Sequence, residues 1–148
     1  MSNNSLEVME KEAKQYIVVM VGNEQYGIDI RYVDNIVRMQ HITRVPKVQT
    51  YFKGIISLRG EIVPVMSIRK KMDLADDEYT NASRIIILKL EEKGAIGIIV
   101  DEVREVVNLS EEQIDRNTNR GRFINGVGKH GEELISLLEI GAIVEETV

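Results

Sequence analysis

Two segments of this chain repeat each other, and the repeat restricts the fold more than any other feature of the sequence. The stretch Gly27–Ile30, followed by apolar residues at 33, 36 and 37, reappears seventy residues later as Gly97–Val100, followed by valines at 103, 106 and 107. A second match has an offset of seventy-two: Gly54 corresponds to Gly126, and apolar positions 62, 65, 66 and 68 correspond to 134, 137, 138 and 140. Both matches occur in the same order, and a small loop insertion explains the different offsets. We therefore predict a duplication of one structural unit.

The amino-acid composition indicates that the repeated unit consists of β-strands. Isoleucine (20) and valine (17) make up a quarter of the 148 residues, against nine leucines and five alanines. β-Branched side chains favour strands over helices. Apolar runs at residues 16–21 and 84–90 have strand length, and residues 55–68 predict a hairpin around the turn at Arg59. Each copy has about five such strands, the number that closes a small barrel. The sequence thus predicts a mostly-β protein with two small barrels that share an interface.

Local signals divide the chain further. The first unit spans roughly residues 15–72 and the second roughly 82–144, and residues 72–81, with four carboxylates, form the predicted linker. Residues 1–14 are polar and predict a flexible head. The apolar spacing at 33–37 and at 103–107 fits either one or two helical turns or a bulged strand. Ser110, with Gln113 three residues later, predicts a short helix, and Pro64 requires the edge of a sheet or a bulge.

The composition excludes several classes of function. The chain has no cysteine and only two histidines, which excludes disulfide scaffolds, thiolate zinc sites and multi-histidine metal sites. Asp115, Asn117 and Asn119 alternate as in a calcium-binding EF-hand loop, but position twelve of that loop is Gly126 instead of glutamate, so a polar loop is expected. A net charge of −5 and few aromatic residues argue against nucleic acid.

The remaining patterns contain no group suited to catalysis. The carboxylates at residues 101, 102 and 105 have the character of a solvated face rather than of an acid–base pair. No apolar run approaches the ~18 residues of a membrane-spanning helix. We therefore expect a cytoplasmic protein that is not an enzyme, with no cofactor, no bound metal and no membrane insertion.

The residues that remain point to protein–protein contact. Arg59 stands in a tight turn between apolar strands, where its guanidinium presents a rigid fork of donors to a partner's carboxylate or to an internal one. Apolar residues at 33, 36, 37, 62 and 106 belong either to the core or to a groove between the barrels.

Three stretches of the chain together resemble the CheW-like family. They are Tyr26–Ile30 with Val33 and Ile36, then residues 52–65, then residues 97–103. The resemblance extends from about residue 15 to residue 140. Its most specific part is Gly-x-x-x-Leu-Arg-Gly-x-Ile-x-Pro-Val at residues 54–65.

The resemblance implies two intertwined five-stranded SH3-like barrels that exchange strands. It also implies a non-catalytic adaptor of bacterial chemotaxis, which couples transmembrane chemoreceptors to the histidine kinase CheA within membrane-associated receptor arrays. One surface would engage the cytoplasmic tip of a methyl-accepting receptor, and another would dock barrel-to-barrel on the regulatory domain of CheA. The alternative is a regulatory module of a larger kinase or of an adaptor–receiver protein. An initial methionine and an end soon after the second unit favour the stand-alone adaptor.

The resemblance also implies a set of protein-binding positions. They are Val33, Asn35, Ile36, Gly54, Arg59, Ile62, Ile85 and Val106. Asn35 departs from the family, which often has a glutamate there as a partner for the arginine. Arg59 is therefore expected to pair with Glu61 or Asp34, or to stay free for a receptor carboxylate, and the change would alter partner choice.

Overall fold

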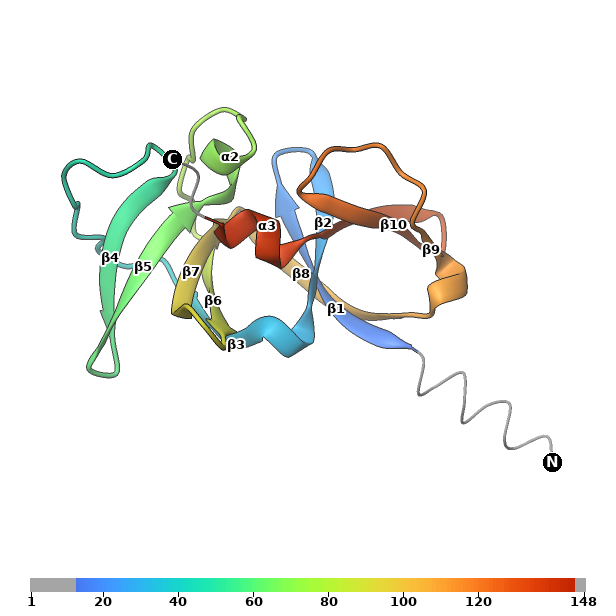
Figure 1. Ribbon diagram of the computed structural model, residues 1–148, viewed down its shortest axis with the longest axis horizontal. Coiled ribbons are helices and arrows are strands. Elements are labelled where there is room, and N and C mark those ends of the chain that lie inside the picture. The colour runs from blue at the N-terminus through green and yellow to red at the C-terminus, as the bar shows by residue number, and fades with distance from the viewer. Residues whose placement is uncertain (1–12, 146–148) are drawn as a thin grey trace.

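The computed structural model describes residues 13–145 as two curled sheets joined side by side (Figure 1). The predicted head falls almost entirely on residues 1–12, which lie outside the described part. The first half of the chain forms β1 (Lys14–Val21), β2 (Glu24–Asp29), β3 (Val33–Arg38), β4 (Phe52–Leu58) and β5 (Glu61–Ser67). The second half forms β6 (Arg84–Leu90), β7 (Gly94–Val100), β8 (Glu102–Leu109), β9 (Ile114–Asp115), β10 (Ile124–His130) and β11 (Glu133–Leu138). The helices are the 3-10 turns η1 (Ile30–Tyr32) and η2 (Glu111–Gln113) and the α-helices α2 (Ile68–Lys71) and α3 (Ile140–Val144).

The order of strands shows a reciprocal exchange between the two sequence copies. One sheet has the order β8-β1-β2-β11-β10-β9, and the other has the order β3-β6-β7-β5-β4. The repeat makes β1 equivalent to β6, β2 to β7, β3 to β8, β4 to β10 and β5 to β11. With this equivalence the two orders are identical, apart from the extra β9. The five-stranded sheet combines three strands of the first copy with two of the second, and the six-stranded sheet combines two strands of the first copy with four of the second, β9 included. The prediction of a mostly-β fold with two intertwined SH3-like barrels is confirmed, but the first sheet has one more strand than predicted.

The glycine near the start of each repeat allows the central strands to pair closely. Gly27 lies opposite Leu137 in the parallel pairing of β2 with β11, and Gly97 lies opposite Val65 in that of β7 with β5. A Cβ atom on Gly27 would lie 2.8 Å from Leu137 Cδ2, and one on Gly97 would lie 2.7 Å from Ile85 Cγ2. The repeated glycines therefore mark close approach of neighbouring side chains rather than turns.

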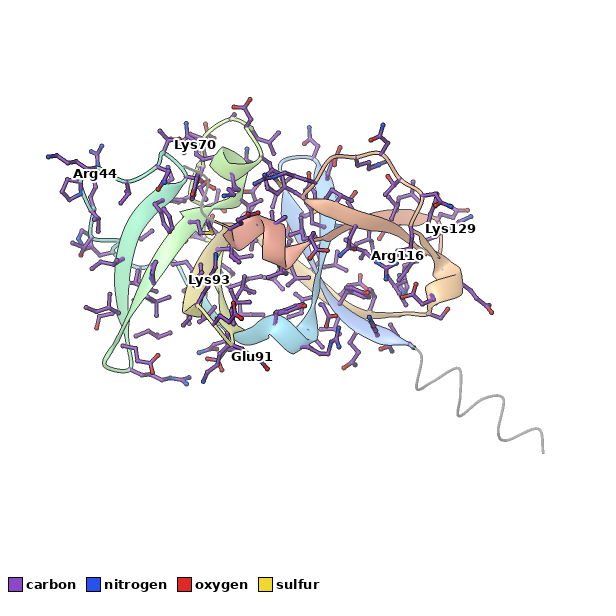
Figure 2. The ribbon with its side chains drawn as sticks, viewed as in Figure 1. Arg44, Lys70, Glu91, Lys93, Arg116 and Lys129 are labelled. Atoms are coloured by element: carbon purple, nitrogen blue, oxygen red, sulfur yellow. The ribbon has the colours of Figure 1, made fainter. Side chains whose placement is uncertain are left out.

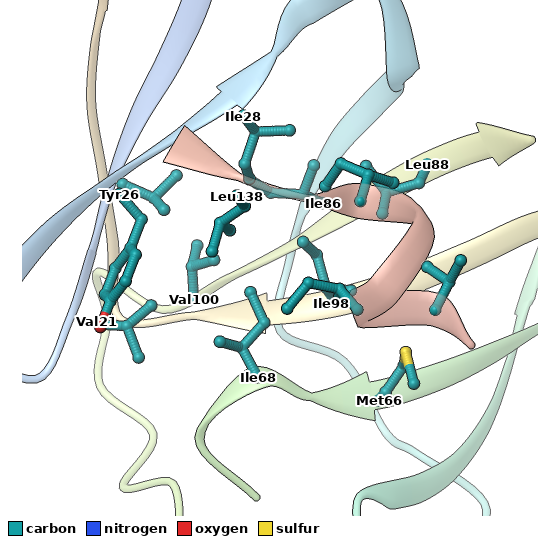
Figure 3. Packing of buried hydrophobic residues seen from close by; sticks show 14 of the residues in the cluster. Val21, Tyr26, Ile28, Met66, Ile68, Ile86, Leu88, Ile98, Val100 and Leu138 are labelled. Atoms are coloured by element: carbon teal, nitrogen blue, oxygen red, sulfur yellow. The ribbon is translucent and has the colours of Figure 1, made fainter. Parts of the chain in front are cut away.

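The hydrophobic core formed by residues 13–145 has three parts, and the largest lies between the barrels (Figure 3). Alternate residues of β6 face different clusters: Ile86 and Leu88 face the shared core, whereas Ile85 and Ile87 face the core inside their own barrel. Strand β1 is divided in the same way between the shared core and the core of the other barrel. Because both faces of these strands are buried, their sequences are continuous apolar runs without polar alternation.

The structure decides between the alternatives that the spacing leaves open after each repeated glycine segment. In the first copy, η1 is followed by strand β3, and the pairing of β3 with β6 is bulged between Val33 and Asn35. In the second copy, β8 follows directly, and its pairing with β1 is bulged opposite Val18 and Val19. A bulged strand is therefore the main structure in both copies. The predicted helix start is confirmed by η2, where the N–H of Ser110 donates to Gln113 Oε1 at 2.9 Å.

Pro64 lies inside the sheet, at a point where no hydrogen bond is lost. It stands opposite Ile55 in the β4–β5 hairpin. The N–H and C=O groups of Ile55 both bond to Thr43 of the loop, each at 2.8 Å, and so point away from β5. The parallel pairing of β5 with β7 begins only at Val65. Neither neighbouring strand therefore needs a hydrogen-bond donor at position 64, and the proline is tolerated although β5 is not an edge strand.

Candidate protein interface

The turn between β4 and β5 presents Arg59 at the tip of a hairpin. Arg59 and Gly60 have φ angles of 51° and 81°, which corresponds to a two-residue turn of type I′. Such turns favour asparagine or glycine, and an arginine there costs about 1 kcal/mol of backbone strain. The side chain of Arg59 is exposed and forms no hydrogen bond or ion pair anywhere in residues 13–145. The internal pairs with Glu61 and Asp34 do not form, so the guanidinium is available to a partner.

Ile62 follows that turn and is the most exposed large hydrophobic residue of the described chain, at 69%. It faces outward, whereas its neighbours Val63 and Val65 point into the barrel core. Leu134 holds the equivalent place in β11 and is 56% exposed. It is absent from the predicted set, although the offset of seventy-two residues that relates it to Ile62 was the available signal. Each barrel therefore carries one outward-facing aliphatic side chain on its β4–β5 or β10–β11 hairpin.

A second pair of exposed apolar residues lies on equivalent edge strands. Ile36 of β3 is 37% exposed and Val106 of β8 is 50% exposed. Strand β3 ends the order of one sheet and β8 ends the order of the other, so both expose unpaired backbone groups. Val33 is half-buried and packs against the shared core, and Asn35 accepts a hydrogen bond from the N–H of Ile36 at 2.8 Å.

Gly54 and Ile85 lie inside the protein. Gly54 has φ 142°, and a Cβ atom there would lie 2.1 Å from the carbonyl oxygen of Thr43. It lets the loop between β3 and β4 lie directly on β4, and so it positions that loop. Ile85 has no exposed surface and packs in the core of its barrel. Because Ile85 has no exposed surface, its side chain does not contact a partner in this arrangement.

A depression lies at the junction of the barrels, between η1, the β6–β7 turn and α3. It is bordered by both charged and apolar side chains, two of which, Glu91 and Lys93, are labelled in Figure 2. None of the predicted contact residues is among those that line this depression. Apart from Ile85 of β6, the predicted residues lie on the β4–β5 hairpin and on the two edge strands instead.

Several titratable groups of the described chain are engaged in structural contacts. Burial raises the pKa of Tyr26 to about 12, and Glu24, which accepts its hydroxyl at 3.2 Å, adds to the rise. Asp101, the first of the three neighbouring carboxylates, is paired with Arg69. Within residues 13–145, no three acidic or histidine side chains converge as a metal site would require. The helices of the same part of the chain are all too short to cross a membrane.

Comparison with known proteins agrees with this architecture. The family model of the CheW-like domain matches residues 15–148. The chain is 31% identical to the chemotaxis protein CheW of Bacillus subtilis, over 92% of this chain and 90% of that protein. It is 32% identical to the chemotaxis protein CheW of Klebsiella aerogenes, over 88% of this chain and 81% of that protein.

A solved structure has the same fold. The crystal structure of the scaffolding protein TtCheW from Thermoanaerobacter tengcongensis superposes with a TM-score of 0.83 at 30% identity, covering 90% of this chain and 94% of that one. Fold, family model and relatives thus agree over nearly the whole sequence. The chain belongs to the CheW family, the non-catalytic scaffolding and coupling proteins of chemotaxis.

Proposed function

We propose that this chain couples the cytoplasmic tips of methyl-accepting chemoreceptors to the regulatory domain of the histidine kinase CheA. The observation that carries the proposal is the β4–β5 hairpin: an unpaired arginine at its tip, held in a strained conformation, beside the most exposed large hydrophobic residue of the described chain. Backbone strain retained at an exposed tip is more common at functional sites than elsewhere. Family membership supports the identity of the two partners.

The receptor surface, in this proposal, is an apolar groove between the barrels. We assign it to the edge strands β3 and β8, which carry Ile36 and Val106 as exposed apolar side chains. Val33, half-buried against the shared core, is the third apolar residue that we assign to this surface. Arg59 orients the receptor by binding a carboxylate, because a planar guanidinium recognises carboxylates in a fixed geometry.

The kinase surface is the outward face of a barrel hairpin. Ile62 is the apolar anchor, and docking of barrel on barrel would remove its exposed surface from water. Gly54 and Ile85 contribute by positioning and packing rather than by contact, because both are buried. Asn35 leaves Arg59 without the carboxylate that the family often supplies, and so keeps the arginine for the partner.

The alternative is a role as a regulatory module within a larger kinase or adaptor–receiver protein. The same surfaces would then dock within one polypeptide. Sequencing the gene beyond the codons of this chain distinguishes the two, since a fused kinase or receiver domain would favour the module.

Calorimetry with the purified regulatory domain of CheA from the same organism tests the proposal. We expect a saturable 1:1 isotherm with a negative heat-capacity change, the signature of apolar burial. Ile62→Ser is expected to weaken binding at least about tenfold, the effect of losing about 1.4 kcal/mol of contact. The matched control is Leu74→Ser, which removes another exposed aliphatic side chain, 41% exposed, outside the hairpin.

Receptor coupling is measured in a separate assay, as activation of CheA in reconstituted arrays. Ile36→Ser and Val106→Ser are expected to reduce activation while leaving binding to the isolated regulatory domain intact. Absence of binding and of co-elution at high protein concentration would contradict the kinase part of the proposal. Full activation by the double variant would contradict the receptor part.

A further inference from the structure

Four cationic side chains converge on one cleft at the end of the barrel that contains β4. Arg44 and Lys47 come from the loop between β3 and β4, Lys53 from β4 and Lys70 from α2. Figure 2 shows Arg44 and Lys70 at the same end of the molecule. Asp76 and Tyr79, of the segment between α2 and β6, also line the cleft. In a chain of net charge −5, this is a local concentration of the opposite sign.

Two carboxylates of the chain already lie near these cations. Asp76 Oδ1 accepts a hydrogen bond from Lys53 Nζ at 2.6 Å, and its Oδ2 lies 3.9 Å from Lys70 Nζ. The bond from Lys53 lowers the pKa of Asp76, whose side chain remains 55% exposed. Arg44 and Lys47 form no hydrogen bond or ion pair within residues 13–145. Asp77 Oδ2 also lies 3.9 Å from Lys53 Nζ. Four cations thus share two carboxylates, and only Lys53 and Lys70 contact them, which leaves capacity for further anionic groups.

An apolar depression adjoins the cationic cleft. Its lining includes Val48, Phe52 and Pro64, and it shares Val45, Val48, Gln49 and Phe52 with the cleft. Val48 is 43% exposed. Gly54 forms part of the floor, where it allows the loop to lie close to β4. The two depressions therefore form one continuous surface, apolar at one end and cationic at the other.

We infer that this surface binds an acidic peptide segment of a partner protein, with an apolar side chain on Val48 and Phe52 and carboxylates on Arg44, Lys47 and Lys53. Charge complementarity argues for the acidic character of the ligand, and the adjoining apolar depression argues for a peptide rather than a nucleic acid. A polyanion that extends beyond the cleft would meet a protein of overall negative charge, which disfavours it. Asp76 imitates one carboxylate of the ligand and competes with it for Lys53.

Fluorescence anisotropy with a synthetic probe tests this inference. The probe is a labelled peptide with a central leucine flanked by glutamates, and its comparison peptide has glutamine in place of every glutamate. We expect saturable binding of the glutamate peptide that weakens as salt is raised, and little binding of the glutamine peptide. The double substitution Arg44→Glu and Lys47→Glu is expected to abolish binding. Arg104→Glu with Lys129→Glu, equal in charge change and located on the other sheet, is the matched control.

The competing carboxylate provides a second readout. Asp76→Asn is expected to tighten the glutamate peptide by about two- to fivefold, the factor that corresponds to loss of one exposed ion pair. If the cleft attracted anions only through its general positive charge, Asp76→Asn would increase the affinity for the glutamate peptide by less than this. The affinity for inorganic phosphate would then increase as well.

Three results would overturn the inference. They are equal binding of the two peptides, retention of binding in the Arg44→Glu, Lys47→Glu variant, and stronger binding of a single-stranded oligonucleotide than of the glutamate peptide. The assay contains neither CheA nor a receptor, so its outcome is independent of the coupling function.

Discussion

Arg69 Nη2 lies 2.5 Å from Asp101 Oδ2, and this pair joins the two barrels. Arg69 belongs to α2, which follows β5 of the five-stranded sheet, whereas Asp101 stands where the chain passes from β7 of that sheet to β8 of the other. Asp101 Oδ2 also accepts the N–H of Gly22 at 2.8 Å, in the β1–β2 turn of the six-stranded sheet. One carboxylate thus holds a helix of one barrel and a turn of the other.

Removal of this carboxylate is expected to destabilise the whole fold. Both side chains are less than one third exposed, at 18% for Arg69 and 27% for Asp101, so water screens the pair only in part. We expect Asp101→Ala to lower the free energy of unfolding by about 2 kcal/mol, through loss of charge-assisted hydrogen bonds. Urea denaturation measures the effect. Glu102→Ala, at the exposed neighbouring position, should change stability by less than about 0.5 kcal/mol, and an equal loss there would contradict the assignment.

Three glycines of the chain lead us to expect a graded series of stability changes. Gly27→Ala should cost about 1–3 kcal/mol, because the new methyl group meets a side chain that can shift. Gly54→Ala should cost about 3 kcal/mol or more, because the methyl group meets the backbone oxygen of Thr43 and the φ angle suits only glycine. Gly141→Ala in α3, where the nearest atom is 3.5 Å away, should be neutral or slightly stabilising. Thermal and urea unfolding of the three variants measures these changes, and a different ranking of the stability losses would contradict the prediction.

Arg59→Asn is expected to separate stability from function. Asparagine suits the left-handed conformation at the tip of the β4–β5 hairpin, so the variant should gain about 0.5–1 kcal/mol of stability. Activation of CheA in reconstituted arrays should fall at the same time, since the guanidinium is lost. Arg59→Lys keeps the charge but not the planar fork, and should recover activation only partly. Unchanged activation by Arg59→Asn would show that the arginine has no role in coupling.

Because the carboxyl of Asp77 is buried, we expect its contribution to the free energy of unfolding to fall as pH rises. Burial raises the pKa of its carboxyl above the ordinary value of 3.8, against the smaller effects of a hydrogen bond from Ser67 and of Lys53 at 3.9 Å. The folded state therefore holds the proton more tightly, and the stability gained by this is complete below pH 3.8 and lost as pH rises through the raised pKa. We expect Asp77→Asn to remove that loss. The free energy of unfolding of the variant should therefore increasingly exceed that of the parent chain from pH 4 towards neutrality.

Asp76 serves as a control, because its contribution to the free energy of unfolding should change with pH in the opposite direction. Its pKa is lowered by the hydrogen bond from Lys53, so its contribution is present above pH 3.8 and lost as pH falls through the lowered pKa. Asp76→Asn should thus weaken the protein slightly at neutral pH and not in strong acid. Urea midpoints measured for both variants between pH 3 and pH 7 should diverge, and parallel curves would contradict the burial of the Asp77 carboxyl.

Much of the secondary structure could be predicted from local sequence patterns. The strand over 84–90 has the expected bounds, and Arg59 lies at the exposed turn that the hairpin pattern indicates. Which side chains face outward was harder to predict. Ile62 and Ile85 are both apolar residues in strands, yet one is 69% exposed and the other has no exposed surface. The difference depends on which faces of β5 and β6 other elements cover, and that information is not local.

The pairing partner of each strand also could not be predicted from local sequence patterns. Nothing in residues 14–29 specifies that β1 and β2 join β8 and β11, more than seventy residues away, because such pairing depends on packing of the whole chain. The sixth strand, β9, has only two residues and gives no periodic signal. The cationic cleft unites residues from the β3–β4 loop, β4 and α2, and it becomes visible only when these elements lie together.

The reciprocal exchange of strands has a consequence for how the molecule can be divided. Cleavage of the backbone within residues 72–81 would separate the two sequence copies but not the two barrels, because each barrel contains strands of both copies. Each fragment alone would lack the partners of its outer strands and expose their edges to water. The fragments should therefore behave as obligate partners that reassemble into one body, in the manner of a domain-swapped dimer whose two subunits have been fused into a single polypeptide.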